Sequence, residues 1–219
     1  MNQTDYWNSV ADSRNFTTAF DEKIFSNYVS KNSKILDVGC GYGRALNELY
    51  HAGYKNLVGV DSSTGMLERG KREIPYLNFV QNDSDLPFDD NRFDAVLLFG
   101  VLWSVVNENA QRDLLNEIKR ILKPEGVIYV NDFLINNDIK SILKYVKFIM
   151  KYDIYGVYEL KDGGILRHHT NKYIKDLFAE FTNWNMERQS LKQSVAIFLM
   201  ASIILEKQIH KEHVFVCYN

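Results

Sequence analysis

Cysteine is scarce in this chain, and charge of one sign is lacking. Of 219 residues only Cys40 and Cys217 are cysteines, too few to indicate a disulfide framework or a zinc site. A reducing, cytoplasmic location is therefore expected. The 26 basic residues are balanced by 28 acidic ones. A nucleic-acid partner is not expected, because such partners normally require a basic domain.

Long hydrophobic runs are also missing. The longest, residues 195–205, has eleven residues and is interrupted only by Ser202, whereas a bilayer span needs ~20. The first sixteen residues are polar and mixed in charge, unlike a signal peptide. We therefore expect a protein without a membrane span. The length and the 46% hydrophobic content fit a single domain over residues 1–219.

The chain is organised around residues 34–49, KILDVGCGYGRALNEL. An apolar run at 35–38 predicts a buried strand, and the apolar spacing after residue 44 predicts a helix. Gly39, Gly41 and Gly43 lie between them. Glycine tolerates positive φ and lets backbone approach a ligand, and a helix N-terminus attracts anions. The stretch predicts a nucleotide or carboxylate site; a turn that binds nothing would need only one glycine.

The glycine spacing narrows the ligand. A dinucleotide fingerprint, G-x-G-x-x-G, has glycine at its sixth position, and Arg44 occupies that position here. The pattern from Asp37 to Gly43 instead resembles motif I of the class I S-adenosylmethionine-dependent methyltransferases, D/E-x-G-x-G-x-G. This resemblance implies S-adenosyl-L-methionine as cofactor, with Asp37 near its amino end. It also implies an α/β fold with a doubly wound, mainly parallel sheet of seven strands and an antiparallel last strand.

Later segments extend the resemblance as far as residue 132. A strand at 56–60 ends at Asp61, whose carboxylate can accept two hydrogen bonds from a ribose diol. A helix at 62–71 and strands at 76–81 and 95–99 follow, with an L-P-F-x-x-x-x-F-D segment before the last strand. Asp83 resembles the family residue that receives the adenine amino group; a helix or turn cap is the alternative. The predicted cofactor site comprises Asp37, Gly39, Cys40, Gly41, Gly43, Asp61, Ser62, Met66, Asp83, Ser84 and Phe99.

The acceptor side is predicted from segments that follow the later strands. Trp103 comes just after the strand at 95–99, where ligands of open α/β sheets bind, although burial in the core is the alternative. A helix at 109–122 and a strand at 127–130 precede Asn131 and Asp132. A helix at 138–151 leads to a hairpin insertion, about 153–169, with its turn at 162–164. Tyr155 and Arg167 of this insertion are predicted to contact substrate.

The terminal regions are less clearly defined by pattern. Residues 5–16 and 17–30 predict two helices or one broken helix, which either pack against the sheet or form a lid over the site. After a helix at 171–181, strands are expected at 184–192 and at 213–218, the latter as the antiparallel last strand. Residues 194–208 could form a helix, a strand or a subunit contact.

The predicted reaction is methyl transfer to a hydroxyl or amine of a small molecule or sugar-like metabolite. Such acceptors need a base, and His168 or His169 is the first candidate because imidazole accepts protons near neutrality. Side chains alternate along a strand, so at most one is expected to face the site. Asp132 is the second candidate, packed histidines are the alternative, and no metal is expected. A cofactor-binding but catalytically idle module and a nucleotide-binding oxidoreductase are the rival functions; the oligomeric state stays open.

Overall fold

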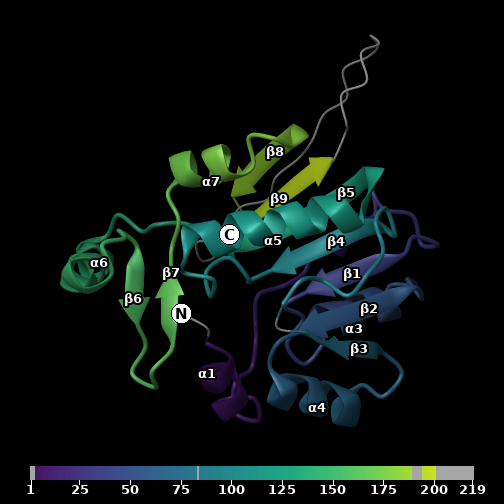
Figure 1. The fold of residues 1–219 in the computed structure, drawn as a ribbon, viewed down its shortest axis with the longest axis horizontal. Helices are drawn as coiled ribbons and strands as arrows, with labels where there is room; N and C mark the ends of the chain where they lie inside the picture. The colour runs from purple at the N-terminus through teal and green to yellow at the C-terminus, as the bar shows by residue number, and fades with distance from the viewer. Residues whose placement is uncertain (1–2, 83, 189–193, 201–219) are drawn as a thin grey trace.

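A seven-stranded sheet forms the centre of the molecule in a computed structural model that describes residues 3–82, 84–188 and 194–200, with side chains through residue 181 (Figure 1). The strands follow the order β3-β2-β1-β4-β5-β9-β8. Their bounds are β1 Ile35–Val38, β2 Leu57–Asp61, β3 Asn78–Gln81, β4 Phe93–Phe99, β5 Leu122–Phe133, β8 Thr182–Arg188 and β9 Ser194–Met200. Strands β1 to β5 pair in parallel, and β9 is antiparallel to both neighbours.

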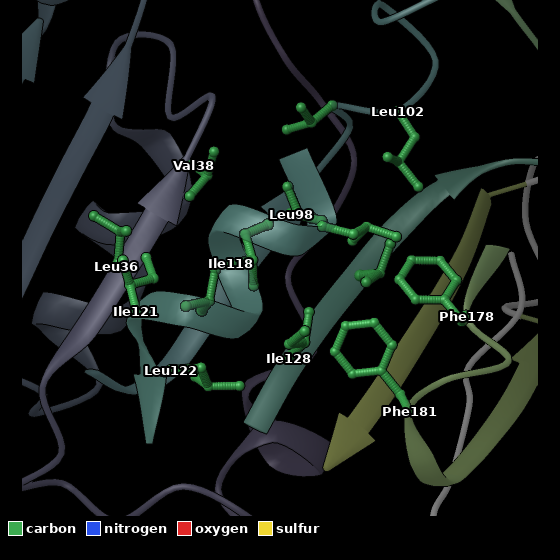
Figure 2. Packing of buried hydrophobic residues seen from close by; sticks show 14 of the residues in the cluster. Leu36, Val38, Leu98, Leu102, Ile118, Ile121, Leu122, Ile128, Phe178 and Phe181 are labelled. Carbon is green, nitrogen blue, oxygen red and sulfur yellow. The ribbon is translucent and has the colours of Figure 1, made fainter. Parts of the chain in front are cut away.

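Alternating side chains of the central strands build two cores, one on each face of the sheet. Leu36 and Leu98 belong to a cluster with α5 (Glu108–Ile121) and α7 (Asn171–Leu177), part of which Figure 2 shows. Ile35 and Leu97 belong to a second cluster with α2 (Glu22–Phe25), α3 (Arg44–His51) and α4 (Thr64–Glu73). Because strand residues point alternately to opposite faces, this doubly wound arrangement requires apolar residues on both faces of the central strands.

A smaller unit stands at one side of the sheet. It contains α6 (Ile139–Tyr152) and a hairpin of β6 (Val157–Glu159) and β7 (Ile165–Arg167), at the left of Figure 1. The hairpin turn falls at residues 160–164, as the sequence predicts, with Leu160 N donating to Gly164 O at 2.7 Å. Within the described ranges, no helix is long and apolar enough to cross a membrane.

The N-terminal helices are shorter than predicted. Described residues 3–30 contain α1 (Thr4–Ser9) and α2, and residues 14–21 between them form neither helix nor strand. One reason is Arg69, whose guanidinium donates to the carbonyl oxygens of Ala11 and Arg14 at 2.9 and 2.7 Å. Carbonyls committed to a side chain in this way do not serve a continuing helix. Each of the predicted ranges, 5–16 and 17–30, therefore contains a helix, but a shorter one than predicted.

The predicted antiparallel last strand, residues 213–218, lies outside the described residues and stays a prediction. An antiparallel strand beside β5 is formed by β9, with Val127 opposite Met200 and Asp132 opposite Val195. The apolar segment whose role the sequence left open is therefore in part an interior strand, and interior strands read as apolar runs.

Candidate functional site

A cavity of about 760 Å³ lies at the carboxyl ends of β1, β2, β4 and β5. Its floor is formed by the strand ends and the glycine turn, and residues of the N-terminal segment also line it. Pockets for small molecules are usually 300–1,000 Å³ in volume. Its lining includes many residues predicted for the cofactor or acceptor: Asp37, Gly39, Cys40, Gly41, Asp61, Ser62, Met66, Ser84, Phe99 and Trp103.

The glycine turn adopts the backbone that its sequence predicts. Gly39, Gly41 and Gly43 have φ of +69°, +55° and +83°, values that L side chains rarely adopt. Space is restricted as well, since a Cβ on Gly39 would lie 2.7 Å from the Val101 side chain. Gly43 caps the N-terminus of α3 but does not line the cavity. The turn thus requires glycine, and two of its glycines face the cavity.

Asp61 connects the end of β2 to the glycine turn. One carboxylate oxygen accepts the Gly41 N–H at 2.7 Å, and the other accepts the Ser63 N–H at 2.8 Å. Burial raises the pKa of this carboxyl, and the backbone donors act in the opposite direction. The side chain also lines the cavity. Asp61 therefore holds the turn in place and presents a carboxylate to a ligand.

Two buried polar atoms of the cavity residues have no hydrogen-bond partner in the described part of the chain. They are Oδ1 of Asp37 and Nδ2 of Asn131. Burial raises the pKa of Asp37 to about 8, and the nearby Arg44 opposes this rise. Buried polar groups normally have partners, so an acceptor and a donor of this kind fit the ammonium and carboxylate of an amino-acid moiety. The donor set fits the methionine part of the predicted cofactor.

The remaining predicted cofactor residues occupy different places. Met66 is buried beside Tyr42, and its backbone N–H bonds to Ser63 Oγ at 3.2 Å. The Cys40 side chain lies against Gly59 of β2. A Cβ added to Gly59 would be 2.7 Å from the Cys40 sulfur, so this position has no room for a side chain. Asp83 lies outside the described residues, so its predicted contact with adenine stays a prediction.

Aromatic side chains form another part of the cavity wall. Trp103 packs on Phe133 with ring centroids 4.6 Å apart, and Phe16 stacks on Tyr42 at 5.4 Å. Trp7 packs in the clusters of both Tyr42 and Trp103. Phe133 was not predicted from the sequence, although it ends β5 at the same edge of the sheet where Trp103 follows β4. Gln3 was missed too, and no pattern in the sequence marks it.

His168 lies behind this wall and outside the cavity lining. Its Nδ1 is 2.7 Å from the Tyr145 hydroxyl and its Nε2 is 2.9 Å from the Tyr158 hydroxyl. The ring stacks on Phe133 at 5.7 Å. Burial lowers its pKa to about 3. The structure therefore places His168 as a neutral, packed residue, away from the base position predicted for it.

His169 and Asp132 are likewise absent from the cavity lining. His169 Nε2 is 3.0 Å from the Gln111 amide nitrogen, and burial lowers its pKa to about 3. Asp132 accepts the N–H groups of Trp103 and Phe133 at 3.1 and 2.8 Å, and burial raises its pKa to about 7. His168 and His169 follow β7 and have different hydrogen-bond partners, and neither of them lines the cavity as a base.

Arg167 and Tyr155 do not reach the cavity either. The Arg167 guanidinium pairs with Glu108 at 2.7 Å and lies over the Tyr173 ring at 4.2 Å. Tyr155 is 40% exposed and packs edge-on against Tyr145. The hairpin thus supports the cavity wall from outside, and the prediction that these two side chains contact substrate is not met in this conformation. Among the described residues no group of three metal-ligating side chains occurs.

Comparison with known proteins adds family information. Residues 36–130 match the methyltransferase domain family. The demethylmenaquinone methyltransferase of Paenarthrobacter aurescens is 34% identical over 134 residues, covering 61% of this chain and 47% of that protein. An uncharacterized protein of Methanocaldococcus jannaschii is 30% identical over 161 residues, covering 70% and 61%. The chain matches less than half the length of the demethylmenaquinone methyltransferases compared with it.

Solved structures show the same fold at low sequence identity. A SAM-dependent methyltransferase of Methanosarcina mazei has a TM-score of 0.71 and 22% identity, covering 84% of this chain and 97% of that one. The 1,6-didemethyltoxoflavin-N1-methyltransferase of Burkholderia thailandensis, solved with its substrate and S-adenosylhomocysteine, has a TM-score of 0.62 and 18% identity, covering 83% and 76%.

Proposed function

We propose that this protein, which belongs to the class I S-adenosylmethionine-dependent methyltransferases, transfers a methyl group to an aromatic small molecule that ionises readily. One observation carries the proposal: a single cavity is lined both by the glycine turn with Asp61 and by the rings of Trp7, Trp103 and Phe133. A cavity of this volume is in the range of small-molecule sites and offers room for a cofactor and a compact acceptor together.

The cofactor end is assigned to residues whose chemistry fits each part of S-adenosylmethionine. Asp37 would receive the ammonium group and Asn131 would donate to the carboxylate, since both have unpaired buried atoms. Asp61 lines the same cavity and would accept from the ribose diol. When bound, the cofactor supplies an activated methyl group on a sulfonium leaving group. The protein's contribution is to hold nucleophile and methyl in line, which alone can lower a barrier by roughly 7–11 kcal/mol.

The class of acceptor is inferred from the side chains that form the cavity wall. Aromatic rings favour flat ligands through stacking. No histidine or lysine occurs among the described residues that line the cavity, so the wall offers carboxylates but no imidazole or amine base. A phenol, hydroquinone or acidic heteroaromatic ring loses its proton without a strong base, whereas an aliphatic hydroxyl does not. A protonated alkylamine has a pKa close to that of a phenol, so it is the aromatic wall that disfavours aliphatic amines. The sequence predicted an acceptor with a hydroxyl or an amine; the proposed acceptor is the narrower class of acidic aromatic compounds.

The attacking atom of such an acceptor is carbon, oxygen or ring nitrogen. Relatives supply examples of two of these: a ubiquinone/menaquinone biosynthesis C-methyltransferase of Campylobacter jejuni is 26% identical over 119 residues, and the Burkholderia structural neighbour is named for a ring-nitrogen methylation. We favour carbon or oxygen of a phenolic ring, because phenolate carries negative charge on both and needs no further group from the protein.

The test is a competition between acceptors of similar size. The protein is incubated with isotope-labelled S-adenosylmethionine and a hydroquinone, a cyclic aliphatic alcohol and a primary amine, and products are identified by mass spectrometry. We expect label in the hydroquinone product, with a rate that rises with pH until the acceptor ionises. Label only in the alcohol or the amine would contradict the proposal. Tight binding of S-adenosylhomocysteine with no transfer to any acceptor would favour the idle, cofactor-binding alternative.

A further inference from the structure

The outward face of α6 is apolar although it is exposed. Ile139, Leu143, Val146 and Met150 are 76%, 63%, 51% and 93% exposed. Their spacing of four, three and four residues places them in one row along the helix. We call these four residues the outer row. Isolated exposed apolar side chains are ordinary, but a contiguous row marks an interaction surface.

A second row of α6 is entirely basic. Lys140, Lys144, Lys147 and Lys151 each follow one residue after a member of the outer row, so they run beside it, about 100° around the helix. The helix sequence, IKSILKYVKFIMKY, contains no acidic residue. Lys151 pairs with Glu159 of the hairpin, and Lys144 lies over the Tyr158 ring at 3.6 Å. Lys140 and Lys147 are exposed.

The inward face of the helix is already occupied. Tyr145 is fully buried and, with Phe148, belongs to the cluster that contains Tyr158 and Leu166 of the hairpin. Folding of the domain therefore uses the aromatic face of α6 and leaves the outer row uncovered. In Figure 1 the helix lies at the edge of the molecule, separated from the central sheet by the hairpin.

We propose that α6, with its exposed apolar row beside a row of lysines, docks on a membrane surface that carries anionic lipids. A helix with one apolar and one lysine-rich face lies in the plane of the bilayer interface, where the apolar side chains enter the headgroup boundary. Lysines near the surface are attracted by anionic headgroups. With 14 residues the helix is about 21 Å long, which suits lying on the surface.

Charge also decides against a second copy of the chain as the occupant. Two copies joined through their outer rows would bring two rows of lysines to one seam, and between the caps Asp138 and Asp153 no carboxylate of α6 would offset them. Like charges at such spacing are destabilising. An anionic lipid surface removes this conflict.

The docked helix would lie close to the elements that close the cavity. The hairpin against which α6 packs is hydrogen-bonded to Gln3 through Ile165, and Gln3 lines the cavity. The inference does not depend on methyl transfer, since lipid binding is measured without cofactor or acceptor.

The experiment is co-sedimentation of the whole chain with vesicles of phosphatidylcholine alone, or of equal parts phosphatidylcholine and phosphatidylglycerol. We expect at least about tenfold tighter binding to the anionic vesicles, from the combined attraction of several lysines. Leu143→Gln with Met150→Gln removes half of the outer row without changing charge and should weaken binding about tenfold or more. Lys140→Gln with Lys147→Gln should weaken it about fivefold per lysine, for anionic vesicles only.

The matched control is Lys71→Gln with Lys172→Gln, which makes the same change in net charge at exposed positions on α4 and α7. This variant should bind like the unmodified protein. If this control lost as much vesicle binding as the α6 lysine variant, the effect would come from net charge alone. That result would overturn the assignment of the lipid contact to α6. Failure of the unmodified chain to bind anionic vesicles would overturn the proposal outright. The proposal would also be overturned if the unmodified protein formed a concentration-dependent dimer that the Leu143→Gln, Met150→Gln variant did not form.

A second measurement uses the unmodified protein and so does not depend on the folding of variants. Amide hydrogen exchange of residues 139–152 should slow when anionic vesicles are added and stay unchanged with neutral ones. Vesicle binding without added protection in this segment would assign the lipid contact to another surface and contradict the proposal.

Discussion

The Asp61 carboxylate accepts the backbone N–H of Gly41 at 2.7 Å, so the end of β2 holds the glycine turn that follows β1. The same carboxylate accepts from Ser63 and lines the cavity. The sequence predicted a carboxylate that accepts hydrogen bonds from a ribose diol. The structure shows one that also carries part of the local fold.

Asp61→Ala should therefore have two effects. We expect binding of S-adenosylhomocysteine to weaken by about 1.5–3 kcal/mol, the range for hydrogen bonds to a charged group. We also expect a loss of stability of about 1–3 kcal/mol, because the Gly41 and Ser63 donors lose their partner. Calorimetry and thermal melts measure the two. Asp61→Asn should show smaller losses in both, and Asp89→Ala, at a 94% exposed side chain, is the control that should show neither.

Asp37 should make cofactor binding depend on pH. Its pKa of about 8 in the free protein means that the carboxyl is largely neutral at pH 7. Binding of an ammonium group favours the carboxylate, so a proton is released on binding. Affinity for S-adenosylhomocysteine should rise as pH increases from about 6 towards 8, and level off above that pH, where the carboxyl of the free protein is already ionised. Titration calorimetry in buffers of different ionisation enthalpy measures the released proton.

The variant Asp37→Asn tests the same assignment through stability. The folded pKa lies above the ordinary value of 3.8, so between about pH 4 and 8 the unfolded chain binds fewer protons and the free energy of unfolding falls as pH rises. Asparagine removes this loss. The free variant should melt several degrees higher than the unmodified protein at pH 7 but bind the cofactor product more weakly. Unchanged affinity together with unchanged melting would remove Asp37 from the site.

Gln3 should couple the N-terminal segment to the aromatic wall of the cavity. Its amide group donates to the carbonyls of Ser104 and Ile165 and accepts the Ile165 N–H at 2.6 Å. Gln3→Ala leaves these groups unpaired and loosens the cover of the cavity, so we expect a several-fold rise in KM for the acceptor with a smaller change in cofactor affinity. Steady-state kinetics measures the split. Asp5→Ala, on the same short helix, is the control, and equal effects of both substitutions would contradict the assignment to Gln3.

His168 and His169 should affect acid stability and leave the pH dependence of catalysis unchanged. Burial lowers the pKa of each to about 3, below the ordinary 6.5. Stability is then fully present above about pH 6.5 and falls as the pH drops towards 3, by up to about 1.4 kcal/mol per pH unit for each histidine. His168→Gln and His169→Gln should each reduce the slope of melting temperature against pH in this window. A turnover profile that loses a group near pH 6.5 in either variant would restore the histidine as a base.

The sequence by itself determined the parts of the site that are made by neighbouring residues. Strand β1, the three glycines and α3 are contiguous, and the positive φ at Gly39, Gly41 and Gly43 is a local requirement that only glycine meets without strain. The position of Asp61 at the end of β2 follows from the same local reasoning, because parallel strands end at one edge of the sheet. The continuous apolar run at 95–99 in β4 is likewise a local pattern, and it is typical of a strand that is covered on both faces.

Only the tertiary structure decided what the hairpin and the N-terminal segment contribute. His168 and His169 look like bases in the sequence, but Tyr145, Tyr158 and Gln111, all distant or on other elements, bind their ring nitrogens and bury them. Gln3 lines the cavity because Ile165, far along the chain, offers it a backbone partner. Such contacts depend on how separate elements pack, and residue spacing does not encode them. The short-range pattern therefore predicted the glycine turn, whereas long-range packing decided which side chains form the wall of the cavity.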